Sequence, residues 1–141
     1  MDIACRRRGP LTVIDLTGRW SIGAAELEVL EFRTLVSRLI ATGCVRVAIN
    51  LTSLLTLDAR GLGEFAEAYK KLRSAGGELT LVRPNRFVRR MLAVTRLDSV
   101  IPYCDSESDL PSASGIHRRA ASAVSRTWAA LAAVVSKEVR C

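Results

Sequence analysis

Aromatic residues are scarce in this chain of 141 residues, because Phe, Trp and Tyr together make up only 5% of it. The core must therefore consist mainly of aliphatic side chains. Histidine occurs once, and no two of the four cysteines have the C-x-x-C spacing of a zinc or redox site. The sequence also offers no nucleophile–base pair. We therefore expect no metal site, no cofactor and no enzymatic activity.

A long apolar run is missing as well. No stretch reaches the roughly 18 apolar residues that a membrane-spanning helix requires, and residues 1–6 lack the apolar segment of a signal peptide. We expect free thiols and a cytoplasmic location. The net charge of +7 suits nucleic acid, an anionic membrane or an acidic partner, but an arginine-rich solvated surface explains it more simply. No aromatic residues are interleaved with the arginines, so direct nucleic-acid binding ranks last.

Strand and helix patterns alternate along the first three quarters of the chain. Strands are predicted at 3–8, 11–17, 45–51, 78–82 and 99–103, and helices at 24–41, between Asp58 and Ala75, and after Asn85. Gly9-Pro10 predicts a hairpin between the first two strands. The order predicts an α/β fold, with a small, mostly parallel sheet of about five strands and helices packed on it.

Two expectations concern individual side chains. Trp20 falls in a predicted loop, 19–23, and we expect it to be a partly buried lid at the sheet edge. The helix after Asn85 is expected to have two faces. Its buried face is predicted to carry Phe87, Val88, Met91, Leu92 and Thr95, and its exposed face Arg86, Arg89, Arg90 and Arg96.

The composition changes after residue 110. Residues 105–115 are acidic and then rich in Ser and Pro, which is typical of a linker. From Ile116 the spacing predicts a basic amphipathic helix with Trp128 on its apolar side. We therefore predict a domain over 1–110, and a linker and appended C-terminal helix over 111–141. That helix can dock on its own domain, pair in a homodimer or lie on an anionic membrane, and docking or pairing is the simpler interpretation.

The turn from Leu57 to Gly63 is the most informative stretch. It connects an apolar strand to a helix, and Asp58 is placed to cap that helix by accepting from its free N–H groups. Gly61 and Gly63 remove side chains from the helix start, at a cost of about 1 kcal/mol each. Either a partner or phosphate approaches closely here, or the helix packs tightly on the sheet. The residues alone leave both explanations open.

The order of elements, the turn 58–63 and the segment Pro84 to Leu92 together resemble a STAS domain, of the bacterial anti-sigma factor antagonist type. The resemblance covers roughly residues 3–110. In that family the protein frees a sigma factor by binding its anti-sigma factor. The anti-sigma factor is usually also a serine kinase, which phosphorylates the Ser or Thr after the turn's Asp. A phosphate adds about −1.5 to −2 charges at the interface, so phosphorylation breaks the complex.

This sequence departs from the family pattern where that switch would act. Ala59 occupies the position of the phosphorylated residue, and Arg60 that of a frequent second serine. The resemblance therefore implies a protein-binding regulator that has no phosphorylation site at the family position. Its partner-binding surface is expected to comprise Ser53, Leu54, Asp58, Ala59, Arg60, Gly61, Gly63, Arg86 and Arg89.

The implied partner is an anti-sigma factor of the serine-kinase type or another signalling protein. The alternative is a STAS accessory or scaffold subunit, either at a membrane that residues 116–141 contact or in a multiprotein signalling complex.

Overall fold

A five-stranded sheet organises the computed structural model, which describes residues 1–20 and 26–110. The strands follow chain order across the sheet: β1 (Asp2–Arg8), β2 (Leu11–Trp20), β3 (Arg46–Leu57), β4 (Glu78–Val82) and β5 (Tyr103–Cys104). β1 and β2 form an antiparallel hairpin, and the other neighbours pair in parallel. The predicted α/β fold with a small, mostly parallel sheet is confirmed.

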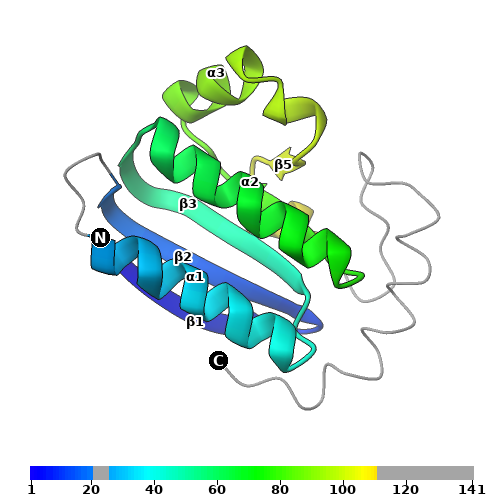
Figure 1. Cartoon of the computed structure of the whole chain (residues 1–141). Helices are drawn as coiled ribbons and strands as arrows, with labels where there is room; N and C mark the ends of the chain where they lie inside the picture. Colours follow the sequence, from blue (N-terminus) through cyan, green and yellow to red (C-terminus); the bar gives the residue numbers. More distant parts are fainter. Residues whose placement is uncertain (21–25, 111–141) are drawn as a thin grey trace.

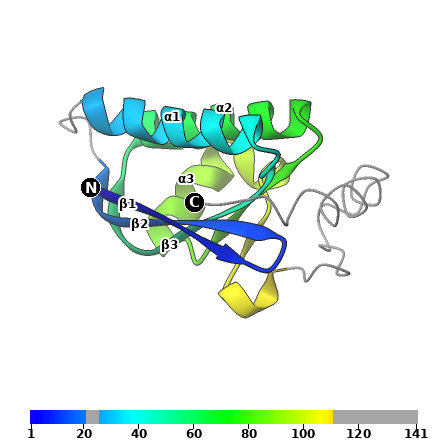
Figure 2. The ribbon, with the colours of Figure 1, turned by 90° about the horizontal axis from the view of Figure 1, so that it is seen from below.

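Helices cover one face of this sheet. α1 (Glu26–Ala41) and α2 (Ala59–Ser74) lie side by side on it, as Figures 1 and 2 show. α3 (Arg86–Val94) adds Val88 and Leu92 to the same core. Alternate side chains of the strands point into this layer, so Ile14, Ile49 and Leu79 are fully buried there.

The opposite face of the sheet carries a smaller apolar cluster. Its members are Leu11, Val13, Ala48, Val82 and Leu110. Leu110 follows the 3₁₀ turn Glu107–Asp109, which Figure 2 shows in yellow on the side of the sheet away from α1 and α2. The last described residue therefore lies on the face opposite the helices.

Trp20 differs from its prediction. β2 continues through Arg19 and Trp20, which pair with Thr56 and Leu57 of β3 after two register shifts and a Gly18 φ of +101°. Trp20 is 1% exposed, and its ring centroid lies 5.2 Å from that of Phe32 and 5.5 Å from that of Phe65. The prediction of a partly buried lid in a loop is wrong: Trp20 belongs to the centre of the core. The rest of the predicted loop, 21–25, lies outside the described residues.

The region after β4 contains two further corrections. Instead of a strand at 99–103, the chain forms a 3₁₀ turn at Leu97–Ser99 and then the two-residue β5. Phe87, predicted on the buried face of α3, is 59% exposed, and Thr95 is exposed as well. Val88 and Leu92 are four residues apart and define the buried side, while Phe87 points about 100° away from Val88 around the helix.

The predicted linker and C-terminal helix, with Trp128, fall mostly in residues 111–141, outside the described part of the chain. None of the helices that the structure describes combines the length and apolar character needed to cross a membrane.

Candidate partner-binding site

The start of α2 is held in place by hydrogen bonds on both sides of Asp58. The Asp58 Oδ1 atom accepts from the Gly61 N–H at 2.9 Å, which confirms the predicted N-cap. The Asp58 N–H donates to the Trp20 carbonyl at 3.1 Å, and the Leu62 N–H donates to the Asp58 carbonyl at 3.0 Å. The turn is thus tied to the end of β2 as well as to its own helix.

The two glycines of this turn have different surroundings. A Cβ atom on Gly61 would lie 2.4 Å from Leu57 Cδ1 and 3.2 Å from the Trp20 ring. Gly61 is buried, so its hydrogen side chain lets α2 pack tightly on the core. Gly63 is exposed, and a Cβ there would meet nothing within 4 Å. The tight-packing explanation is therefore confirmed for Gly61, and approach of a partner at Gly63 stays a prediction.

The remaining residues of the turn face outward. Ala59 and Arg60 are exposed, and Asp58 is half-buried. Ser53, on the last part of β3, is exposed, whereas Leu54 is buried in the core. Of the residues predicted at this turn, Gly61 and Leu54 are therefore buried beneath the protein surface. Ser53, Ala59, Arg60 and Gly63 are exposed on it.

The other predicted residues lie at the start of α3. Asn85 caps this helix by accepting from the Val88 N–H at 2.9 Å. A hollow of about 450 Å³ joins this helix start to β3, and its lining residues are Leu51, Thr52, Arg83, Pro84, Asn85, Arg86 and Arg89. Arg86 and Arg89 therefore lie beside the strand that leads into the turn at Asp58.

The two predicted arginines of α3 differ in their contacts. Arg86 is exposed. Arg89 is half-buried: its Nε donates to the Pro84 carbonyl at 3.0 Å, it pairs with Asp105, and its guanidinium lies 5.2 Å from the Tyr103 ring centroid. Arg89 therefore holds α3 against the β5 segment, and Arg86 has more freedom to meet a partner.

Sequence reasoning missed two exposed apolar residues near this surface, Leu55 and Phe87, which are 65% and 59% exposed. Leu55 precedes the turn on β3, and Phe87 follows Arg86. Strand alternation could not reveal Leu55, because the buried residues at the end of β3 recur every third position, at 51, 54 and 57. Exposed apolar side chains beside charged ones are typical of protein-contact surfaces.

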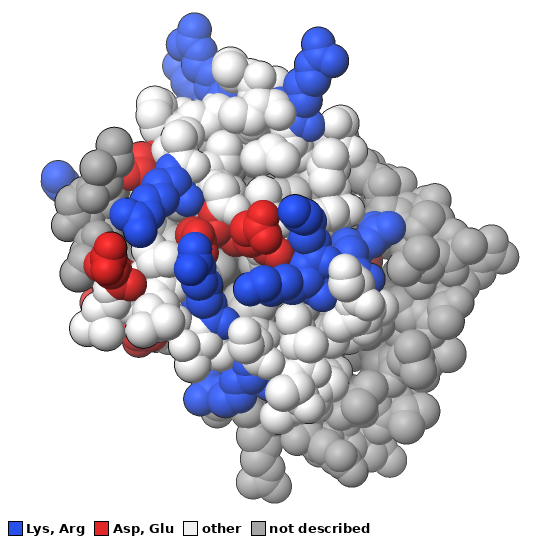
Figure 3. All heavy atoms as spheres, viewed as in Figure 1, with Lys and Arg blue, Asp and Glu red and all other residues white. Residues whose placement is uncertain are grey.

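Charges of both signs cover the helical face of the molecule. Figure 3 shows basic and acidic residues interspersed over α1 and α2, with only basic ones at the top of the view, where α3 lies. One ion pair joins α1 to α2: Arg33 Nε and Nη2 donate to the two Glu64 carboxylate oxygens at 2.6 and 2.7 Å. These hydrogen bonds lower the pKa of Glu64, so the pair is ionised at neutral pH.

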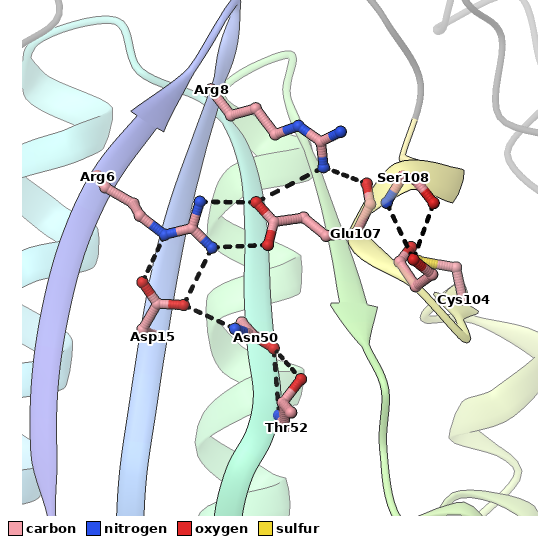
Figure 4. A network of polar contacts seen from close by, with 9 residues as sticks. Arg6, Arg8, Asp15, Asn50, Thr52, Cys104, Glu107 and Ser108 are labelled. Carbon is pink, nitrogen blue, oxygen red and sulfur yellow. Dashed lines mark hydrogen bonds and ion pairs between the residues drawn. The ribbon is translucent and has the colours of Figure 1, made fainter.

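A polar network occupies the other face of the sheet (Figure 4). Arg6 donates to both Asp15 oxygens, at 2.7 and 3.3 Å, and to both Glu107 oxygens, at 2.6 and 2.7 Å. Asn50 donates to Asp15 at 2.7 Å. Burial raises the pKa of Asp15, but the hydrogen bonds from Arg6 and Asn50 outweigh it and the net shift is downward. Hydrogen bonds from Arg6 lower the pKa of Glu107. Neither carboxyl is therefore poised to donate a proton at neutral pH.

The fold is that of a small α/β domain with a mostly parallel sheet. In the described part of the chain, no three His, Cys, Asp or Glu side chains group so that they could hold a metal ion. The family model of the STAS domain matches residues 4–110, and the chain belongs to this family.

Three curated relatives carry the name anti-sigma factor antagonist, two of them from Thermotoga with the qualifier putative. An anti-sigma F factor antagonist of Paenibacillus polymyxa is 31% identical over 64 residues, which cover 45% of this chain and 55% of that protein. The matches span less than three fifths of the length of the curated relatives.

Solved structures share the fold. The crystal structure of an anti-sigma factor antagonist from Mycobacterium paratuberculosis has a TM-score of 0.65 at 20% identity, covering 77% of this chain and 88% of that one. The Bacillus cell fate determinant SpoIIAA in its phosphorylated form has a TM-score of 0.61 at 19% identity, covering 76% of this chain and 95% of that one.

Proposed function

We propose that this STAS protein binds an anti-sigma factor of the serine-kinase type through the start of α2 and the adjoining start of α3, and that this binding is not switched at residue 59. The observation that carries the proposal is the turn after Asp58, where Ala59 and Arg60 are exposed and the Asp58 cap holds the backbone, on a fold shared with anti-sigma factor antagonists. Its binding residues are those predicted from the sequence and facing outward, together with Leu55 and Phe87.

Residue 59 is where the proposed function departs from the phosphorylated relative. Ala59 is the first residue of α2 and is exposed, and a methyl group cannot accept a phosphate. A phosphate would place about −1.5 to −2 charges on this surface, whereas Arg60 adds one positive charge. The charge that releases the partner in a switched protein is thus absent, and Arg60 with Arg86 favours approach of an acidic partner.

The binding surface is tested by affinity capture from the host lysate, with mass spectrometry to identify the captured protein. Gly63→Trp adds a bulky side chain to the exposed side of the turn, where there is space for it. Ser74→Trp is the matched control, because Ser74 is exposed at the other end of the same helix. We expect wild type and Ser74→Trp to recover an anti-sigma factor and Gly63→Trp to recover at least tenfold less. Equal recovery by all three would show that the interface lies elsewhere.

The absence of the switch is tested with the captured anti-sigma factor and labelled ATP. We expect Ala59→Ser to become phosphorylated and wild type to stay unlabelled. Ala93→Ser, which places a serine at an exposed position on α3, is the control and should stay unlabelled. Label on the wild-type chain would contradict the proposal, since another residue would then serve as the acceptor.

A further inference from the structure

An apolar groove runs between β1 and α1, away from the proposed binding surface. It has a volume of about 650 Å³, and its lining residues are Ile3, Cys5, Leu27, Leu30, Glu31, Thr34, Leu35 and Arg38. Leu27 and Leu30 are 69% and 58% exposed. Two leucines three positions apart lie on the same side of a helix, so α1 presents a second apolar stripe beside the one it buries in the core.

The described chain ends close to one wall of this groove. Glu107 is bound by Arg6 and Arg8 of β1, and Leu110 belongs to the apolar cluster that includes Leu11 of β2. β1 also carries Ile3, which lines the groove from the opposite side of the sheet. β1 is the edge strand, so it alone separates the two faces of the sheet on this side. Residues 111–119, which precede the predicted apolar stripe, span up to about 30 Å when extended, whereas packed layers lie about 10 Å apart.

The sequence beyond residue 115 has the chemistry that this groove needs. Its predicted apolar stripe comprises Ala120, Ala121, Val124, Trp128, Leu131, Val135 and Val139. As a helix, residues 120–139 would be about 30 Å long and α1 is about 24 Å long, so the stripe can follow the whole groove. The groove carries one charge of each sign, Glu31 and Arg38, between apolar side chains, so the match with the segment is one of apolar surfaces.

We propose that residues 116–141 bind in the β1–α1 groove of their own chain, with Trp128 against Leu27 and Leu30. This occupant covers two exposed leucines and an apolar stripe at once, at about 25 cal/mol per Å² of apolar surface removed from water. The groove shares no residue with the proposed partner-binding surface. Binding of the segment there therefore leaves the start of α2 accessible.

The proposal is tested on the full chain by acrylamide quenching of tryptophan fluorescence. Trp20 is buried in the core, so the quenching reports on Trp128. Leu30→Asp places a charge in the groove, and Val94→Asp is the matched control because Val94 is 78% exposed on α3. We expect Leu30→Asp to raise the quenching constant at least twofold over wild type, and Val94→Asp to leave it unchanged. Equal constants for the two variants, or wild-type quenching equal to that of free tryptophan, would overturn the proposal.

Limited trypsin digestion gives a second measurement that does not depend on tryptophan. Cleavage after Arg119 and Arg126 should be slow in wild type and in Val94→Asp, and at least fivefold faster in Leu30→Asp. Molar mass is measured in the same samples by light scattering. A dimer that Leu30→Asp dissociates would assign the groove to a second copy, and protection of Trp128 only with phosphatidylglycerol vesicles would assign the segment to a membrane. Either result would overturn binding within one chain.

Discussion

The two sides of the first turn of α2 follow opposite rules. On the inner side, Gly61 lies so close to Leu57 and Trp20 that a methyl group fits only if these buried side chains shift. On the outer side, Ala59 and Gly63 are exposed, and an added side chain at Gly63 meets nothing within 4 Å. The same residue type, two positions apart, is thus required by packing in one place and compatible with many side chains in the other.

This difference explains why the shape of the turn does not depend on the side chain of residue 59. The conformation is determined by the Asp58 cap, its hydrogen bond to the Trp20 carbonyl, and the packing of Gly61. None of these contacts involves the side chain of residue 59. A change from Ser to Ala at that exposed position therefore alters the chemistry of the surface without altering the core.

The largest effect is expected from removing the Trp20 ring, which packs against the inner side of the turn. Trp20→Ala deletes a fully buried ring in contact with Phe32 and Phe65. We expect a loss of about 3–5 kcal/mol in the free energy of unfolding, measured by urea denaturation and far-UV circular dichroism. Leu55→Ala, at an exposed position near the turn, is the control and should change it by about 0.5 kcal/mol or less. A loss below about 1 kcal/mol for Trp20→Ala would mean that the inner side does not hold the turn.

The two glycines provide a smaller but sharper test. Gly61→Ala forces a methyl group against Leu57 and Trp20, and overpacking of this kind costs about 1–3 kcal/mol. That cost exceeds the gain of up to about 1 kcal/mol from replacing glycine in a helix. Gly63→Ala has the same gain in helix propensity without a packing cost, because a Cβ there meets nothing within 4 Å. We expect the midpoint of urea unfolding to fall for Gly61→Ala and to rise for Gly63→Ala. Shifts of the same sign in both variants would remove the distinction between the two sides.

The smallest expected effect is that of Arg6→Gln on the free energy of unfolding. Its pH dependence distinguishes a contribution from charge from one due to packing. The pKa values of Asp15 and Glu107 are lowered in the folded protein. Their stabilisation is therefore present above the unfolded pKa, near about 4, and is lost as the pH falls through the lowered folded value. Arg6→Gln should cost about 0.5–1 kcal/mol at pH 7, and its difference from wild type should shrink toward pH 2.

The Trp20→Ala loss is the reference for this pH series, since apolar contacts do not titrate. It is measured by urea denaturation at the same pH values. An Arg6→Gln difference that stays constant from pH 7 to pH 2 would show that the network in Figure 4 does not stabilise through its charges.

Most of the helices and strands could be predicted from the spacing of apolar residues in the sequence. The helix stops and caps, such as Asn85 before α3, were visible because they depend on local backbone chemistry. The errors have a common physical cause. Trp20, Leu55 and Phe87 were misplaced or missed because the register shifts between β2 and β3, the three-residue burial pattern of β3 and the exact rotation of α3 depend on distant neighbours.

The candidate site divides in the same way. The Asp58 cap and the absence of a hydroxyl at residue 59 are local facts that the sequence contains in full. Which of Leu54, Gly61, Gly63 and Arg89 would face a partner was not predictable, because their exposure depends on Trp20, Asp105 and Tyr103, far away in the chain.

By itself, the amino-acid sequence determined the α/β order of elements, the capped start of α2 and the lack of a phosphate acceptor at residue 59, because each depends on residue types at short spacing. Only the tertiary structure decided that Gly61 serves the core and Gly63 the surface. The two glycines have the same intrinsic backbone freedom. They differ because β2 places the Trp20 ring beneath Gly61 and not beneath Gly63.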